Sequence, residues 1–314
     1  MKLALQHEFA HVRAMTPRTL GLVGAPSSAG AYAPGQEKAP AAFRRHGLVS
    51  AMESVGITVR DLGDVESFRW RPDPGRPKAM NLEAVASTAA VVAERVGACL
   101  ARDEAVLVLG GDCTVELGSV AGALSDRASA GLVYIDFDVD LNIPAESDGA
   151  LDWTGVAHLL DLPGTAPDLS GLGPRRPMLG PADILYFAAE NITAAEARTL
   201  DELAIDRIDL ESVKADPMGA ARQAVEWTAK FDRLLVHLDV DVLAFTDFPI
   251  AENSRRCDGL RFQELAEALQ VLLAAPNWRV LTVTEVNPDH APDEGETFGR
   301  LIDMLSRALA NEHR

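Results

Sequence analysis

Short apolar runs alternate with longer amphipathic segments along the chain. The run that starts at Thr19 (TLGLVGAPSS) ends in Gly, Pro and Ser, as a buried strand does where it enters a loop. Residues 38–56 have apolar positions near helical spacing and end in Gly56, and residues 57–65 (ITVRDLGDV) alternate like a second strand. The pattern predicts a strand-helix-strand unit at the start of the fold.

The same alternation continues to the C-terminus. Residues 81–103 form an alanine-rich amphipathic stretch typical of a long helix, and apolar strands followed by helical segments recur after it. Strands that alternate with helices of this length predict an α/β fold whose parallel sheet is covered on both faces. Because no internal repeat or linker interrupts the pattern, we expect one domain over residues 1–314.

Charge and composition argue against some classes of binding partner. Arginine and lysine number 29 against 47 aspartate and glutamate residues, a net charge of −18, which argues against nucleic acid and anionic membrane as partners. The first residues contain His7, Glu8 and His11 where a signal peptide needs an apolar run, and no apolar run is long enough to span a membrane. We therefore expect a soluble, cytoplasmic protein. Three cysteines without CxxC spacing imply neither a disulfide framework nor a structural zinc site.

Acidic or thiol groups follow four of the predicted strands, in VLGGDC, YIDFDVD, VHLDVDV and TVTEVNP. The carboxyl ends of parallel strands meet at one edge of a sheet, where loops and helix N-termini also converge. The four motifs therefore predict a single shared site at that edge.

The carboxylates in this site are unusually dense. Asp136, Asp138 and Asp140 are spaced so that they would face the same side if the strand ran through them, and Asp239 and Asp241 repeat the spacing. Five carboxylates in one desolvated cleft stay ionised only with cations between them, so a pair of divalent metals is predicted. Oxygen-rich clusters of this kind suit Mn or Mg. The alternative is that each aspartate caps a turn or helix on its own.

Five motifs together resemble the ureohydrolase family of arginases, agmatinases and formiminoglutamases. GLVGAPSSAG, LVLGGDCTVELGS, IDFDVDLNIP, LDVDVL and TEVNPDHAPDE fall in the order and spacing of that family, and the likeness covers nearly the whole chain. The resemblance implies an arginase-like three-layer α/β/α sandwich with a central parallel sheet. It also implies two divalent ions, Mn above all, at the carboxyl edge of the sheet, and a homo-oligomer, usually a trimer or hexamer.

Two of the implied metal-ligand positions depart from the family pattern. GGDC replaces GGDH and DFDVD replaces DxHxD, so that Cys113 and Asp138 stand where histidines belong. The full set that the resemblance implies is Cys113, Asp136, Asp138, Asp140, Asp239 and Asp241. With every ligand anionic, a bridging water should have a raised pKa, and the thiolate should favour softer ions such as zinc or Fe(II) at its end. Alternatively, Cys113 is a buried, metal-free thiol beside a degenerate site.

The resemblance also assigns residues outside the metal ligands. Glu285 matches the acid that binds the substrate's guanidinium group, and its alternative role is that of a strand-end acid paired with an arginine. Asn142 matches the loop that meets the far end of the substrate. The family's proton-shuttling histidine aligns with Asp152, and an aspartate of ordinary pKa is a poor acid at pH 7. His158 is a possible substitute, although a histidine in GVAHLL is more often packed, and His237 would at most support a ligand.

The resemblance implies a metal-dependent hydrolase of a guanidino compound, that is, a linear amidine. In this reading a metal-bridging hydroxide held by Asp140 attacks the guanidinium carbon while Glu285 orients the substrate, and urea and an amine are released. The alternative is a non-catalytic or metal-deficient arginase-like binding or regulatory protein, disabled by the changes at Cys113, Asp138 and Asp152. A purely structural role in an oligomer is a third alternative, which Glu285 disfavours.

Overall fold

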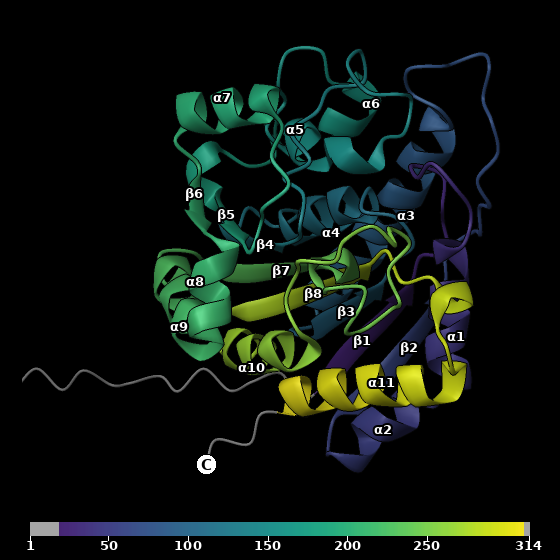
Figure 1. Cartoon of the computed structure of the whole chain (residues 1–314), viewed down its shortest axis with the longest axis vertical. Helices are drawn as coiled ribbons and strands as arrows, with labels where there is room; N and C mark the ends of the chain where they lie inside the picture. The colour runs from purple at the N-terminus through teal and green to yellow at the C-terminus, as the bar shows by residue number, and fades with distance from the viewer. Residues whose placement is uncertain (1–18, 311–314) are drawn as a thin grey trace, which may run out of the picture.

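An eight-stranded parallel sheet runs through the centre of the molecule (Figure 1). The computed structural model describes residues 19–310. The strands are β1 Thr19–Gly24, β2 Thr58–Asp64, β3 Ala105–Leu109, β4 Ala130–Ile135, β5 Ile184–Phe187, β6 Asp206–Ile208, β7 Arg233–Asp239 and β8 Trp278–Thr284. Their order in the sheet is β2-β1-β3-β8-β7-β4-β5-β6, and all neighbouring pairs are parallel.

Helices cover both faces of this sheet (Figure 1). One layer holds α3 Leu82–Leu100, α4 Val115–Ala123, α5 Gly155–Leu159, α6 Pro167–Ser170 and α7 Ala194–Leu203. The other holds α1 Ala39–Arg45, α2 Leu48–Ser54, α8 Leu210–Ala215, α9 Pro217–Thr228, α10 Phe262–Leu272 and α11 Glu294–Ala310. The predicted α/β/α sandwich with a central parallel sheet is confirmed.

The strands are apolar on both faces because each face supports a separate core. Leu107 and Leu109 of β3 pack into the core on the side of α1, α2 and α11, whereas Val106 and Val108 pack into the core on the side of α3 and α4. Successive side chains of a strand point to opposite faces, so a continuous apolar run is what a strand between two layers requires. This is why the short apolar runs could be recognised as strands.

One local expectation was wrong. The helix predicted over residues 38–56 is split into α1 and α2, because Gly47 between them has a φ of 86°, in the left-handed region that ends a helix. β4 ends at Ile135, so Asp136 and Asp138 follow the strand, as expected of acidic groups placed directly after an apolar run. The Asp138 backbone N–H donates to Asp136 Oδ1 at 2.7 Å, a turn that an aspartate closes with its own side chain.

Two further expectations meet the structure only in part. Among residues 19–310, no helix is both long and apolar enough to cross a membrane. The single domain over residues 1–314 stays a prediction, and residues 1–18 and 311–314, including His7, Glu8 and His11, lie outside the described residues.

Candidate metal centre

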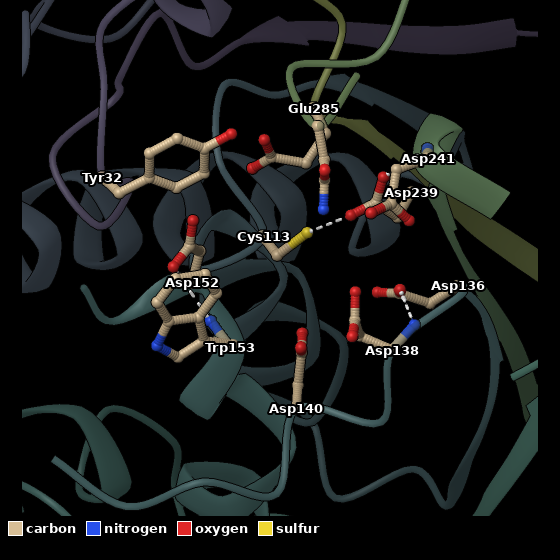
Figure 2. A pocket seen from close by; sticks show the side chains of 11 residues that line it. Tyr32, Cys113, Asp136, Asp138, Asp140, Asp152, Trp153, Asp239, Asp241 and Glu285 are labelled. Carbon is tan, nitrogen blue, oxygen red and sulfur yellow. Dashed lines mark hydrogen bonds between the residues drawn. The ribbon is translucent and has the colours of Figure 1, made fainter. Parts of the chain in front are cut away.

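The four strands that carry the acidic and thiol motifs are consecutive neighbours, in the order β3-β8-β7-β4. Their carboxyl ends deliver Cys113, Glu285, Asp239 and Asp136 to one pocket. Figure 2 shows these side chains pointing toward one another across the pocket, together with Asp138, Asp140 and Asp241. The sheet therefore brings together every metal-ligand position that the sequence predicted.

Cys113 is placed by the Gly110-Gly111 turn after β3. A Cβ at Gly111 would lie 1.6 Å from the Ser27 carbonyl oxygen, so only glycine allows this close approach of two backbone segments. The thiol is buried, and its Sγ lies 3.0 Å from Asp239 Oδ2 and 3.3 Å from Thr284 Oγ1. Burial, and then the charge of Asp239, raise the pKa of the Cys113 thiol well above its ordinary value. A cation beside the sulfur would be needed to hold it as a thiolate.

Asp136, Asp239 and Asp241 form the floor of the pocket. Their ligand oxygens lie within 4.8 Å of one another. The Asp241 backbone N–H donates to Asp239 Oδ1 at 2.7 Å, which fixes that carboxylate. Asp136 Oδ2 and Asp241 Oδ1, by contrast, are buried without a hydrogen-bond partner among the described residues. Burial, and then neighbouring carboxylates, raise the pKa of Asp136 and Asp241 well above the ordinary value.

This donor set fits a divalent cation. Orphaned, buried carboxylate oxygens are costly unless a proton or a cation satisfies them. The Cys113 thiol lies close to Asp136 and Asp239, and the three aspartates lie within reach of one another; thiol and carboxylate groups are ligands that Zn, Fe or Mn accept. The residues present are therefore compatible with the metal that the resemblance implies.

Asp140 is oriented by a hydrogen bond from a buried tyrosine. Its Oδ2 accepts a hydrogen bond from the buried hydroxyl of Tyr134 at 2.5 Å. The residue has a φ of 51°, a left-handed conformation that costs a non-glycine residue about 1–3 kcal/mol. Burial raises the pKa of Asp140 well above its ordinary value. The strained backbone and the Tyr134 contact together aim this carboxylate at the pocket.

Asp138 is engaged differently from the other aspartates. Asn191 Nδ2 donates to its Oδ1, and Arg256 Nη2 donates to its Oδ2. The Arg256 Nε lies 3.6 Å from Asp241 Oδ2, and its guanidinium carbon lies 5.2 Å from the ring centroid of Phe137. Both oxygens of Asp138 therefore have protein partners. The sequence analysis missed Arg256, for which the only signal was a pair of arginines in the loop after the DxD motif of β7.

His237 on β7 lies behind the carboxylates. It is fully buried, and its ring stacks on Tyr134 at 4.1 Å between centroids. Its Nδ1 is 3.3 Å from Glu116 Oε2 and its Nε2 is 3.9 Å from Asp136 Oδ2. The ligand atoms of Cys113, Asp136 and His237 lie within 4.8 Å of one another. His237 is therefore close enough to be a metal ligand, which its position before the LDVD motif did not reveal.

Glu285 closes the pocket from the end of β8. Its Oε2 accepts a hydrogen bond from Gln36 Nε2 at 2.9 Å, whereas its Oε1 is buried without a partner among the described residues. Its φ of 61° is again left-handed. Burial, and then Asp239, raise the pKa of Glu285 well above its ordinary value. The partner of this acid is thus an amide, not the arginine of the alternative reading.

Asp152, Trp153 and Tyr32 line one side of the pocket (Figure 2). Burial, and then the charge of Asp112, raise the pKa of Asp152 well above its ordinary value, so the assumption of an ordinary pKa was wrong. The rings of Tyr32 and Trp153 stack at 6.0 Å between centroids. Beyond them lies a cavity of about 330 Å³, lined by Tyr32, Asp148, Trp153, Asn253, Arg255 and Arg256.

Two sequence candidates do not line this pocket. Asn142 Nδ2 donates to Glu196 Oε1 at 2.9 Å, so this amide is directed to the start of α7. His158 is buried in α5, with its Nδ1 2.7 Å from the Thr154 carbonyl oxygen and its Nε2 accepting from the Ala166 N–H at 3.0 Å. Packing rather than catalysis accounts for His158. The role of Asn142 in substrate binding stays a prediction that its contact with Glu196 does not favour.

The site defines a class of protein: an α/β fold with a carboxylate and thiol centre at the carboxyl edge of its parallel sheet. Residues 18–309 match the model of the arginase family. The chain belongs to the arginase family. It is similar to an arginase of Glaciozyma antarctica, with 31% identity over 291 residues that cover 87% of this chain and 81% of that protein. It is also similar to human arginase-1, with 26% identity over 277 residues that cover 86% of this chain and 85% of that protein.

Solved structures share the fold. The arginase of Bacillus caldovelox superposes with a TM-score of 0.83 at 22% identity, covering 95% of this chain and 99% of that one. The formimidoylglutamase of Bacillus subtilis superposes with a TM-score of 0.72 at 18% identity, covering 93% of this chain and 86% of that one. At these identities the likeness shows the fold, and the chemistry depends on the residues of this chain.

Proposed function

We propose that this chain is a metal-dependent hydrolase of a guanidino compound, which it cleaves to urea and an amine. The observation that carries the proposal is the buried Oε1 of Glu285, which has no hydrogen-bond partner among the described residues and shares one pocket with Cys113 and the aspartates. A buried carboxylate oxygen needs a donor, and a guanidinium group offers paired N–H donors in the geometry that a carboxylate accepts. Glu285 would hold the substrate's guanidinium over the metal ligands.

The cofactor in this proposal is a divalent metal. The orphaned oxygens of Asp136 and Asp241 and the thiol of Cys113 supply the donors, and the family resemblance supports a full complement of two ions, with Mn as the expected metal. Such ions, when bound, lower the pKa of a coordinated water and polarise the group it attacks.

The remaining roles belong to protein groups. Asp140, oriented by the Tyr134 hydroxyl, would position the attacking water through its carboxylate. Asp152 lines the same pocket and would hold a proton for the leaving amine, because burial raises its pKa well above the ordinary value. Tyr32 and Trp153 would restrict access of bulk water to the pocket. We further propose that the active form is a cytoplasmic homo-oligomer, a trimer or hexamer, as the resemblance implies.

The test is urea release from a panel of guanidino compounds by metal-loaded protein. An Asp140→Asn variant should lose at least about 100-fold in turnover, because the amide replaces a carboxylate aimed at the pocket, and should keep its far-UV circular dichroism spectrum. Asp201→Asn, the same change on the exposed side of α7, is the matched control and should keep full turnover. Equal urea release by Asp140→Asn and the wild type would refute the proposal.

A second candidate function is a metal-deficient relative that binds a ligand without hydrolysing it. The observation that favours it is the engagement of Asp138 by Arg256 and Asn191, which occupies a carboxylate that the family resemblance assigns to metal. This candidate predicts no urea from any guanidino compound, with or without added metal. Metal-dependent urea release from a single compound would exclude it.

A further inference from the structure

The two ends of the carboxylate cluster differ in charge and in donor chemistry. At one end, Arg256 lies between Asp138 and Asp241, donating to the first and 3.6 Å from the second. Its guanidinium is mostly buried, with a side-chain exposure of 20%, and lies over the ring of Phe137. A cation from the chain itself therefore already stands between two carboxylates at this end.

This placement also balances a substitution. Where the family pattern has a neutral histidine, Asp138 adds a negative charge, and Arg256 adds the positive charge that cancels it. Asp138 is partly buried, with a side-chain exposure of 23%, and a carboxylate in this position is unfavourable without such a partner. Asp138 and Arg256 are therefore best understood as one unit that replaces a metal-binding imidazole.

At the other end an imidazole is present after all. His237 Nε2 faces Asp136 at 3.9 Å, and the ligand atoms of His237, Cys113 and Asp136 lie within 4.8 Å of one another. Glu116 lies 3.3 Å from Nδ1, so a proton on Nδ1 would leave Nε2 as an acceptor on the side of Thr284 Oγ1, at 3.5 Å, and of Asp136. A carboxylate behind a histidine is the arrangement that orients metal-binding imidazoles in proteins. The imidazole that position 113 lacks is thus supplied from β7, which lies two strands away from β3 in the sheet.

We infer that the centre is asymmetric: one divalent ion binds at the end formed by Cys113, Asp136 and His237, while the guanidinium of Arg256 holds the other cation position until a second ion displaces it. The inference rests on the metal-dependent part of the proposed function. Sulfur and nitrogen ligands make the Cys113 end suited to zinc or cobalt, whereas the Asp138 end offers only oxygen. The two ions should therefore bind with different affinities and different metal preferences.

The first experiment counts ions. Wild-type protein is loaded with excess Zn or Mn and dialysed against metal-free buffer, and the metal is measured by elemental analysis. We expect one retained ion per chain in the wild type and two in Arg256→Met, which keeps most of the side-chain volume but removes the competing cation. Arg255→Met, which neutralises the exposed neighbouring residue, is the matched control and should retain one ion.

If Arg256→Met does not fold, Arg256→Gln takes its place. Two tightly held ions in the wild type, or one in the Arg256 variant, would overturn the inference at this end.

The second experiment identifies the ligands of the tight ion. Cobalt-loaded wild type should show the near-ultraviolet charge-transfer absorption of a thiolate bound to Co(II), and Cys113→Ser should lose it. His237→Gln should weaken cobalt binding at least about 10-fold, and Glu116→Gln less than that. Cobalt affinity unchanged in His237→Gln would remove His237 from the site. Neither experiment uses substrate. One tightly held ion per chain together with no urea release would refute only the proposed function. Two equally tight ions together with urea release would refute only this inference.

Discussion

Glu285 has a buried carboxylate oxygen without a hydrogen-bond partner among the described residues. Removing its charge therefore tests directly whether the substrate is a guanidinium compound. In Glu285→Gln the carboxamide keeps the shape and one acceptor oxygen but loses the charge. A hydrogen bond to a charged group contributes about 1.5–3 kcal/mol, so kcat/KM for a guanidino substrate should fall about 10- to 150-fold. Steady-state urea release over a range of substrate concentrations measures this ratio.

Glu252 provides the matched control for that variant. It is a buried acid whose backbone N–H donates to the Glu285 carbonyl oxygen at 2.8 Å, yet its side chain accepts from Asn287 and does not line the pocket. Glu252→Gln should change kcat/KM much less than Glu285→Gln. Equal losses in the two variants would mean that Glu285 acts through the local fold and not through the substrate.

The sequence indicated which candidate metal ligands follow strand ends, but it did not indicate which residues contact them. Asp136 and Asp239 stand directly where an apolar run ends, and parallel topology sends such positions to one edge. Arg256 lies in a loop without periodicity, so no pattern could aim its guanidinium at Asp138. The pairing of His237 with Glu116 joins residues 121 positions apart, and only the packing of α4 against β7 brings them together.

Helix α5 depends on a histidine that must stay neutral. His158 is buried, bonded through Nδ1 to the Thr154 carbonyl oxygen and through Nε2 to the Ala166 N–H, so protonation of Nε2 would break the second bond. Burial lowers the pKa of His158 below its ordinary value near 6.5. Between that value and the lower folded pKa the unfolded chain binds more protons than the folded one, so stability falls as pH falls through this window.

His158→Gln should therefore flatten the pH dependence of stability as the pH falls below about 6.5. The difference in slope between wild type and variant cannot exceed about 1.4 kcal/mol per pH unit for one proton. Urea denaturation at several pH values measures both slopes, and the comparison cancels all groups that the two proteins share. His290→Gln controls for the loss of an imidazole as such. Parallel curves for wild type and His158→Gln would show that His158 does not contribute to acid sensitivity.

Helices and strands were predictable where the local signals of the sequence agreed. Apolar runs became strands and the alanine-rich segment became α3, because periodicity and propensity agreed there. The split between α1 and α2 was missed because helical periodicity continues across Gly47, and only its left-handed φ of 86° ends the first helix. The end of β4 could be placed because Asp136 follows the apolar run directly, and its side chain then closes a turn by accepting from the Asp138 N–H.

The sheet as a whole concentrates negative charge that the fold alone cannot satisfy. Neighbouring strands β3, β8, β7 and β4 end together, and each contributes at least one buried acid or thiol to the pocket. The sequence predicted that these ends share an edge, but it could not give their order across the sheet, which depends on how distant strands pair. Burying these carboxylates without a counter-charge is unfavourable, so a bound cation should stabilise the folded state.

That stabilisation can be measured as a shift of the melting temperature. An ion that binds only the folded chain, at 100 times its Kd, adds about 2.7 kcal/mol to the free energy of unfolding, which corresponds to several degrees in Tm. Removal of metal with a chelator should therefore lower Tm, and added Mn or Zn should restore it. In Asp136→Asn, which loses an orphaned oxygen shared by both ends of the cluster, the chelator should have little effect. A wild-type Tm that does not respond to chelator or to metal would favour the non-catalytic relative over a metallohydrolase.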